Sequence, residues 1–101
     1  MLGPMRYALV LLAVALSACA PSWDYVPVVE RVGGGLAEAP GLATPAHIDR
    51  VEDVFAYYGT PTERTSPATL RVGGARPGRE FVWNVATKAE DAAWLREHPA
   101  P

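Results

Sequence analysis

The stretch TPAHIDRVEDVFAYYGTP, residues 44–61, carries the clearest structural signals in this chain. Thr44 can cap a helix by accepting a backbone hydrogen bond, and Pro45 suits the first helical position, where its missing N–H costs nothing. Gly59 can adopt the left-handed conformation that ends a helix, and the proline two positions later prevents continuation. The sequence therefore predicts a helix over residues 45–58.

One face of this predicted helix is apolar. Its large apolar side chains recur at steps of three and four positions: Ile48, Val51, Val54, Phe55 and Tyr58. Charged side chains occupy the remaining surface, which is typical of a helix that packs one face on a core. We expect this stripe to form the centre of a small domain.

The residues that follow predict a β-hairpin after a turn over residues 60–67. Residues 68–72 form a short strand candidate and residues 79–86 a stronger one, with Pro77-Gly78 suited to the turn between them. Alternation places Phe81, Trp83 and Val85 on one face of the second strand, against the helix stripe.

A second, shorter helix is predicted near the C-terminus. Thr87 and Glu90 have the spacing of a capping box, which would open a helix that ends at about His98. The expected fold class is α+β: one amphipathic helix, a β-hairpin and a short C-terminal helix over residues 45–101. A domain of about 55 residues has a marginal core, so it would gain stability from a partner, and this favours an interaction module.

Residues 19–44 are rich in proline and glycine and are interpreted as a tether that joins an anchor to the domain. Within them, residues 25–32 could form an edge strand or remain polyproline-like, because Pro27 lacks a donor. Trp23 and Tyr25 suit either a lipid headgroup region or packing on the domain.

Residues 1–18 have the organisation of an export signal, with Arg6 as the only charge before a run of about 14 apolar residues. That run is shorter than the roughly 18 to 20 residues a membrane-spanning helix needs. Leu16-Ser17-Ala18-Cys19 resembles the lipobox of bacterial lipoproteins.

The lipobox resemblance implies cleavage between Ala18 and Cys19 and acylation of the Cys19 thiol, so that membrane lipid becomes the anchor. Two or three acyl chains hold a protein durably on a bilayer, since each buried methylene contributes about 0.8 kcal/mol. In a diderm host, Ala20 after the cysteine implies sorting to the outer membrane, facing the periplasm. An ordinary secretory signal that happens to contain a cysteine is the alternative.

Composition excludes several classes of function. The net charge of −2 does not suit a nucleic-acid binder, and a single cysteine cannot form an intramolecular disulfide. His47, Asp49 and Asp53 could approach one another on the first helix, but a solvated charged face explains them better than a metal site. No catalytic triad or phosphate-binding loop is visible, so we predict a non-enzymatic protein without cofactor or metal.

Arginines form the one concentration of like charge, around the turn and the hairpin: Arg64, Arg71, Arg76 and Arg79. Arg71, Arg76 and Arg79 are candidate contacts for an acidic partner or lipid headgroups, although solvated side chains interleaved with glutamates explain them as well. Trp83 and Trp94 could anchor a partner, or they could belong to the core.

Residues 49–62, a helix that ends in Gly-Thr-Pro, together with Phe81-Val-Trp83 on a following strand, resemble part of the small outer-membrane lipoproteins of the SmpA/OmlA type. That resemblance implies a role in outer-membrane protein assembly. The chain lacks the first helix and the third long strand of that pattern. A small lipid- or ligand-binding module is a further alternative, but it needs a pocket that so short a domain can hardly enclose.

Overall fold

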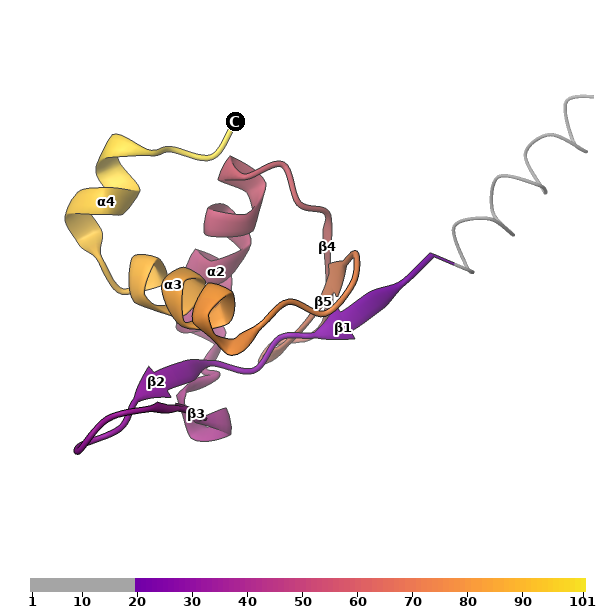
Figure 1. Cartoon of the computed structure of the whole chain (residues 1–101). Coiled ribbons are helices and arrows are strands. Elements are labelled where there is room, and N and C mark those ends of the chain that lie inside the picture. The colour runs from indigo at the N-terminus through magenta and orange to yellow at the C-terminus, as the bar shows by residue number, and fades with distance from the viewer. Residues whose placement is uncertain (1–19) are drawn as a thin grey trace, which may run out of the picture.

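A computed structural model describes residues 20–101 (Figure 1), so the predicted signal, Ala18 and Cys19 lie outside the described residues. The elements in chain order are β1 (Ser22–Asp24), β2 (Val28–Glu30), β3 (Leu36–Glu38), the 3-10 turn η1 (Pro40–Leu42), α2 (Pro45–Tyr57), β4 (Thr62–Ser66), β5 (Thr69–Gly73), α3 (Arg79–Ala89) and α4 (Ala92–Glu97). The fold class is α+β, as predicted. In the part of the chain that the structure describes, no helix combines the length and the apolar character needed to cross a bilayer.

Helix α2 forms where the sequence predicts it. The Thr44 side chain accepts a hydrogen bond from the His47 backbone N–H at 3.2 Å, and Gly59 has a φ of +73° just past the helix end. The stripe residues Ile48, Val51, Val54 and Phe55 are fully buried. Tyr58, expected to extend that stripe, is instead 48% exposed.

A β-hairpin is present, but its strands and its turn differ from the prediction. β4 and β5 pair through Thr62↔Val72 and Glu63↔Arg71, and residues 67–68 form the turn. The expected strand over residues 68–72 is confirmed as β5, whereas the predicted turn at Pro77-Gly78 is not a hairpin turn. β5 is the central strand of a three-stranded antiparallel sheet in the order β1-β5-β4.

Residues 79–86 were predicted as the second strand of the hairpin, and this is wrong, because they belong to helix α3. Both edges of β5 are already paired, one with β1 and one with β4, which leaves no edge for another strand. The segment instead buries the side chains that recur at helical spacing: Val82, Val85, Ala86 and Ala89. Phe81, expected in the core, is 43% exposed.

The predicted capping box at Thr87 is also wrong. Thr87 lies inside α3, where its hydroxyl donates to the Trp83 carbonyl at 2.8 Å. The second C-terminal helix, α4, begins later and is capped by Asp91, whose carboxylate accepts from the Trp94 backbone N–H at 3.0 Å. A C-terminal helix therefore exists, but Glu90 is left free to take part in another interaction.

The segment interpreted as a flexible tether forms three strands, which is the largest correction to the sequence prediction. β1 pairs with β5 through Trp23↔Val72, and the Tyr25 backbone N–H donates to the Leu70 carbonyl at 2.9 Å. β2 and β3 form a separate hairpin, closed by the glycines of residues 33–35, which all have positive φ. Of residues 25–32, only Val28–Glu30 form the predicted edge strand, as β2.

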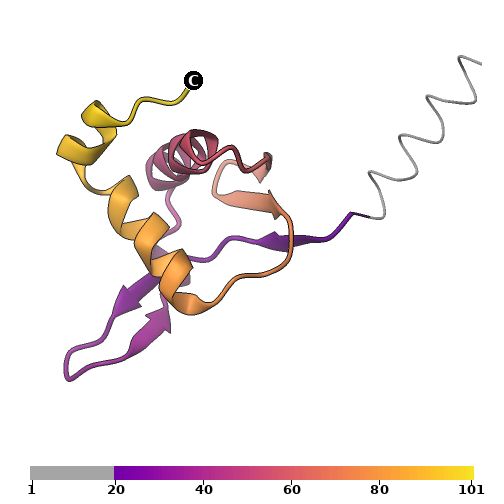
Figure 2. The same ribbon diagram turned by 45° about the horizontal axis from the view of Figure 1, so that its top comes forward.

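A single hydrophobic core joins all these parts. Helices α2 and α3 pack against each other, with the three-stranded sheet against α2 and the β2–β3 hairpin against α3 (Figure 1). The side chains of Trp23, Tyr25 and Val28 are buried in this core, next to Phe55 of α2. Figure 2 shows the β2–β3 hairpin at the end of the domain opposite residue 20.

Candidate functional site

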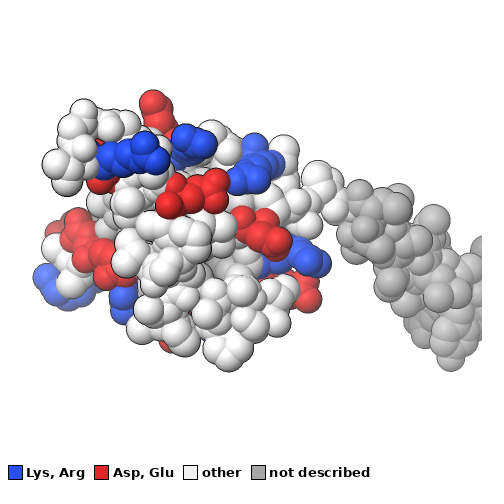
Figure 3. Space-filling model, turned by 90° about the horizontal axis from the view of Figure 1, so that it is seen from below, with Lys and Arg blue, Asp and Glu red and all other residues white. Residues whose placement is uncertain are grey.

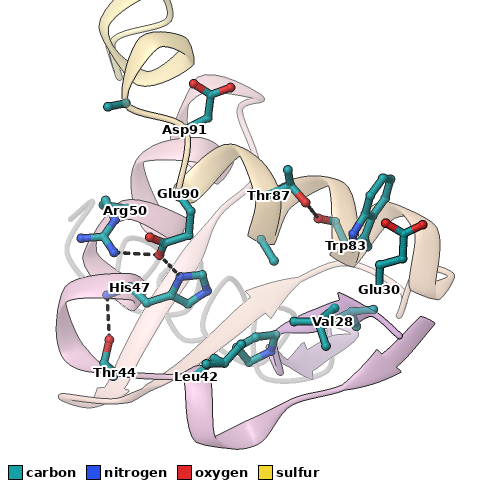
Figure 4. Close-up of a pocket in the computed structure, with 14 residues that line it drawn as sticks. Val28, Glu30, Leu42, Thr44, His47, Arg50, Trp83, Thr87, Glu90 and Asp91 are labelled. Carbon is teal, nitrogen blue, oxygen red and sulfur yellow. Dashed lines mark hydrogen bonds and ion pairs between the residues drawn. The ribbon is translucent and has the colours of Figure 1, made fainter. Parts of the chain in front are cut away.

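A groove of about 860 Å³ lies between the β2 strand and the helices α2 and α3 (Figure 4). Its apolar lining comes from all sides of the groove: Pro27, Val28 and Val29 of the β2 segment, Leu42 of η1, and Trp83 and Ala86 of α3. The sequence prediction held that so short a domain can hardly enclose a pocket. The groove exists because the presumed tether folds and supplies one of its walls.

A hydrogen-bonded cluster lies at the helix end of the groove, centred on His47 (Figure 4). His47 is only 5% exposed, and its Nε2 lies 2.8 Å from the Tyr25 hydroxyl oxygen. Its Nδ1 lies 2.7 Å from Oε1 of Glu90, which also accepts from Arg50 Nη2 at 2.7 Å. Arg50 Nε donates to the Ala89 carbonyl at 2.8 Å. The cluster connects the β1–β2 segment, α2 and the end of α3.

The chemistry of the partners fixes how the hydrogens are arranged around a neutral His47. An ionised carboxylate can only accept, so the Nδ1–H of His47 donates to Glu90. Nε2 then accepts from the Tyr25 hydroxyl, and both ring nitrogens of the buried imidazole are satisfied. Such complete pairing matters because an unpaired buried polar group is costly.

The cluster also shifts the acidities of its members. Hydrogen bonds from Arg50 and then from His47 hold the pKa of the Glu90 carboxyl below its ordinary value of 4.5. Burial, assisted by the negative charge of Glu90, raises the pKa of the Tyr25 hydroxyl. At neutral pH Glu90 is therefore ionised and Tyr25 keeps its proton.

The hydroxyl groups that line the groove are engaged in local hydrogen bonds. Thr44 caps α2, and Thr87 donates to a carbonyl of its own helix. What the groove offers to a ligand is apolar contact from its floor together with the carboxylates of Glu30, Glu90 and Asp91. Apolar contact together with carboxylates suits the binding of a ligand that has both apolar and basic groups.

Two of the three arginines predicted as partner contacts, Arg71 and Arg76, lie beside carboxylates. Arg71 Nε lies 3.8 Å from a carboxylate oxygen of Asp24, and Arg76 Nη2 lies 3.4 Å from one of Glu38. Arg79 is the first residue of α3. Figure 3 shows acidic and basic side chains interspersed on the face it presents, without a large area of one sign.

The residues considered for a metal site are separated by their partners. Asp49 forms an ion pair with Arg64, whereas His47 points to Tyr25 and Glu90. Within residues 20–101, no group of three histidine, cysteine, aspartate or glutamate side chains could hold a metal ion.

The two tryptophans weighed as anchors or core are both half-buried at the edge of the core. Trp83 lines the groove. Trp94 stacks on His98 with ring centroids 4.4 Å apart and contacts Tyr57 edge-on at 5.4 Å. Only Trp83 therefore combines partial burial with a place in the candidate site.

No protein-family model, curated protein or solved structure matches this chain. The strand expected from the SmpA/OmlA resemblance is absent too, because Phe81 and Trp83 lie in α3.

Tyr25 and Glu90 are the site residues that sequence reasoning missed. They lie 22 and 43 positions from His47, and neither spacing is a local signal. The sequence places Glu90 in a capping box and allows Tyr25 either the headgroup region or packing on the domain; the structure confirms the packing. The one available hint was a histidine one turn from an arginine at the start of a strongly amphipathic helix.

Proposed function

We propose that this chain is a bacterial envelope lipoprotein that is acylated on Cys19 and acts as a non-enzymatic interaction module at the outer membrane, facing the periplasm. The lipobox-like sequence Leu16-Ser17-Ala18-Cys19 supports the acylation. The observation that carries the proposal furthest is the position of the first strand, because β1 begins at Ser22, three residues after Cys19.

This spacing determines how the domain would sit on a bilayer. Three extended residues span at most about 11 Å. An acylated Cys19 therefore holds the β1 end of the domain against the lipid headgroups, without a long tether. The side chains at that end include Ser22, Thr62, Glu63 and Arg71, which surround a shallow hollow next to Pro21.

The same arrangement directs the groove toward a partner. The β2–β3 hairpin lies at the end of the domain opposite residue 20 in Figures 1 and 2. With Cys19 in the membrane, the hairpin and its groove face away from the bilayer, where another envelope protein can reach them.

Intact-mass spectrometry of the protein purified from the envelope fraction tests the acylation. The expected mature chain begins at Cys19 and carries the mass of a diacylglyceryl group, with or without an additional acyl chain. A Cys19→Ala variant should lose that mass and leave the membrane fraction or remain as precursor, and a Ser22→Ala variant serves as the matched control. A wild-type mature chain without fatty acid would refute the proposal.

A further inference from the structure

The wall of the groove formed by β2 has an unpaired backbone edge. The Ala39 N–H donates to the Pro27 carbonyl at 2.7 Å, and the Arg31 N–H donates to the Gly35 carbonyl at 2.8 Å. In an antiparallel pair these hydrogen-bonded positions alternate with positions whose N–H and C=O point to the opposite edge. Val28 and Glu30 occupy those alternate positions, opposite Glu38 and Leu36.

This outer edge of β2 faces the groove. The groove lining includes residues 27–30, but none of the β3 residues 36–38, so the groove runs along the side of β2 that is away from β3. Within residues 20–101, the backbone groups of Val28 and Glu30 have no hydrogen-bond partner on that side. An unpaired strand edge in an apolar groove is a template for one more strand.

The charges of the groove limit what that strand can carry. Glu30, Glu90 and Asp91 supply three carboxylates against the one guanidinium of Arg50, which gives a net charge of −2 with His47 neutral. Arg50 is already held by Glu90 and by the Ala89 carbonyl. An occupant that complements this charge is basic.

From the free edge and the acidic lining, we propose that the groove binds an extended segment of a partner protein, in which apolar side chains alternate with lysine or arginine, as an added strand on β2. Apolar side chains of the segment pack on Val29, Leu42 and Trp83, and its basic groups pair with the lining carboxylates. A groove of this size also lies within the range of small ligands, but a small ligand would not use the row of backbone groups. The inference deepens the proposed role as an interaction module and does not depend on acylation of Cys19.

The first test uses a labelled, end-capped hexapeptide of alternating valine and lysine, titrated onto the full-length protein in mild detergent and followed by fluorescence anisotropy. We expect saturable binding, lost when glutamate replaces each lysine and lost when all backbone amides are N-methylated. Equal binding of the N-methylated peptide would overturn the strand-addition proposal. Binding of octylammonium without binding of the peptide would overturn it in favour of a small amphiphile.

Protein variants locate the binding edge. Glu30→Pro removes a backbone donor on the groove edge of β2, whereas Glu38→Pro removes one on the outer edge of β3, and neither donor belongs to the β2–β3 ladder. We expect Glu30→Pro to weaken peptide binding about fivefold relative to Glu30→Gln, which lacks the same carboxylate but keeps the backbone donor, and Glu38→Pro to leave binding unchanged. Equal loss in both variants would contradict the assignment to β2.

A second variant pair distinguishes a loss of binding from misfolding. Glu30→Lys reverses an exposed charge in the groove and Glu97→Lys makes the same change on α4, so both variants should keep the wild-type circular dichroism spectrum and melting temperature. We expect only Glu30→Lys to weaken binding, by about tenfold. Hydrogen exchange at the Val28 and Glu30 amides should slow when the peptide binds. Dimerisation of the free chain that slows the same amides without peptide would overturn the proposal, because the occupant would then be a second copy.

Discussion

Residues 22–38 and helix α2 are equally part of the domain, but they reach their structure by different routes. The signals that specify α2 lie within its own sequence. Thr44 caps its start, apolar side chains recur at the helical period on its buried face, and Gly59 ends it. The segment 22–38 has no comparable helical pattern, and its first part, β1 and Tyr25, pairs with the distant residues Val72 and Leu70 of β5. The difference teaches that proline- and glycine-rich composition near an anchor does not by itself indicate a tether.

Replacing Trp23 should have the largest effect, because it removes a core side chain from the supposedly unstructured segment. Trp23 is 8% exposed and contacts Phe55 edge-on at 6.1 Å between ring centroids. We expect Trp23→Ala to lower the free energy of unfolding by about 3 to 5 kcal/mol, measured by urea denaturation followed by circular dichroism.

Val32 provides the control from the same segment, since its side chain is fully exposed at the hairpin tip. Val32→Ala should change the free energy of unfolding by less than about 0.5 kcal/mol. If the segment were a tether, both Trp23→Ala and Val32→Ala would have small effects. A Trp23→Ala protein as stable as the wild type would therefore show that the segment behaves as a linker.

Tyr25→Phe tests the polar connection between the two regions. The change removes the hydroxyl that satisfies Nε2 of buried His47 while leaving the ring contacts with Phe55 in place. We expect a loss of about 1 to 3 kcal/mol in the free energy of unfolding, the cost of one unpaired buried group. Tyr57→Phe is the matched control, because the Tyr57 side chain is 43% exposed and outside the cluster. Equal melting temperatures for the two variants would show that the hydroxyl of Tyr25 contributes nothing.

Thr44→Ala probes the local signal of α2. Loss of the cap should cost about 1 kcal/mol, whereas Thr44→Ser keeps the accepting oxygen and should cost less. Thermal unfolding of both variants measures the difference. If serine and alanine were equivalent, the helix would owe its start to tertiary packing alone.

The acid dependence of stability should show the smallest effect, because half of the Glu90 side chain is exposed. The pKa of Glu90 is lower in the folded protein than its ordinary 4.5, so its stabilising contribution is complete above about pH 4.5 and is lost as the pH falls through the lower folded value. We expect the stability difference between wild type and Glu90→Gln to shrink as the pH is lowered through this range. A difference that stays constant with pH would show that the ionisation of Glu90 does not contribute to the stability of the folded protein.

The parts of the fold that could be predicted from the sequence are those specified by residues close together in the chain. The α+β class, helix α2 and strand β5 could be predicted because caps, glycines and periodicity act within a few residues. Residues 81–89 carry two patterns at once: Phe81, Trp83 and Val85 alternate as in a strand, whereas Val82, Val85 and Ala89 recur as in a helix. The choice between them depends on β1 occupying the other edge of β5, which no local pattern reveals.

The candidate site was less predictable than the fold for the same reason. Its histidine, tyrosine and glutamate come from three segments that meet only after β1 has joined the sheet and α3 has packed on α2. The sequence suggested His47 only as part of a disfavoured metal site, and no pattern connects the residue with Glu90. The arginines were singled out because they are close together in the sequence, whereas the structure shows Arg71 beside Asp24 and Arg76 beside Glu38.

Hydrogen exchange at the Tyr25 amide, measured by NMR on the full-length protein, tests most directly whether residues 22–38 are part of the folded domain. This N–H donates to the Leu70 carbonyl, and the Ile48 N–H, which donates to the Thr44 carbonyl in α2, provides the internal reference. We predict that both amides exchange slowly and with similar protection, as expected for one cooperative core. Exchange of the Tyr25 amide at the rate of an unstructured peptide, with Ile48 still protected, would contradict the account.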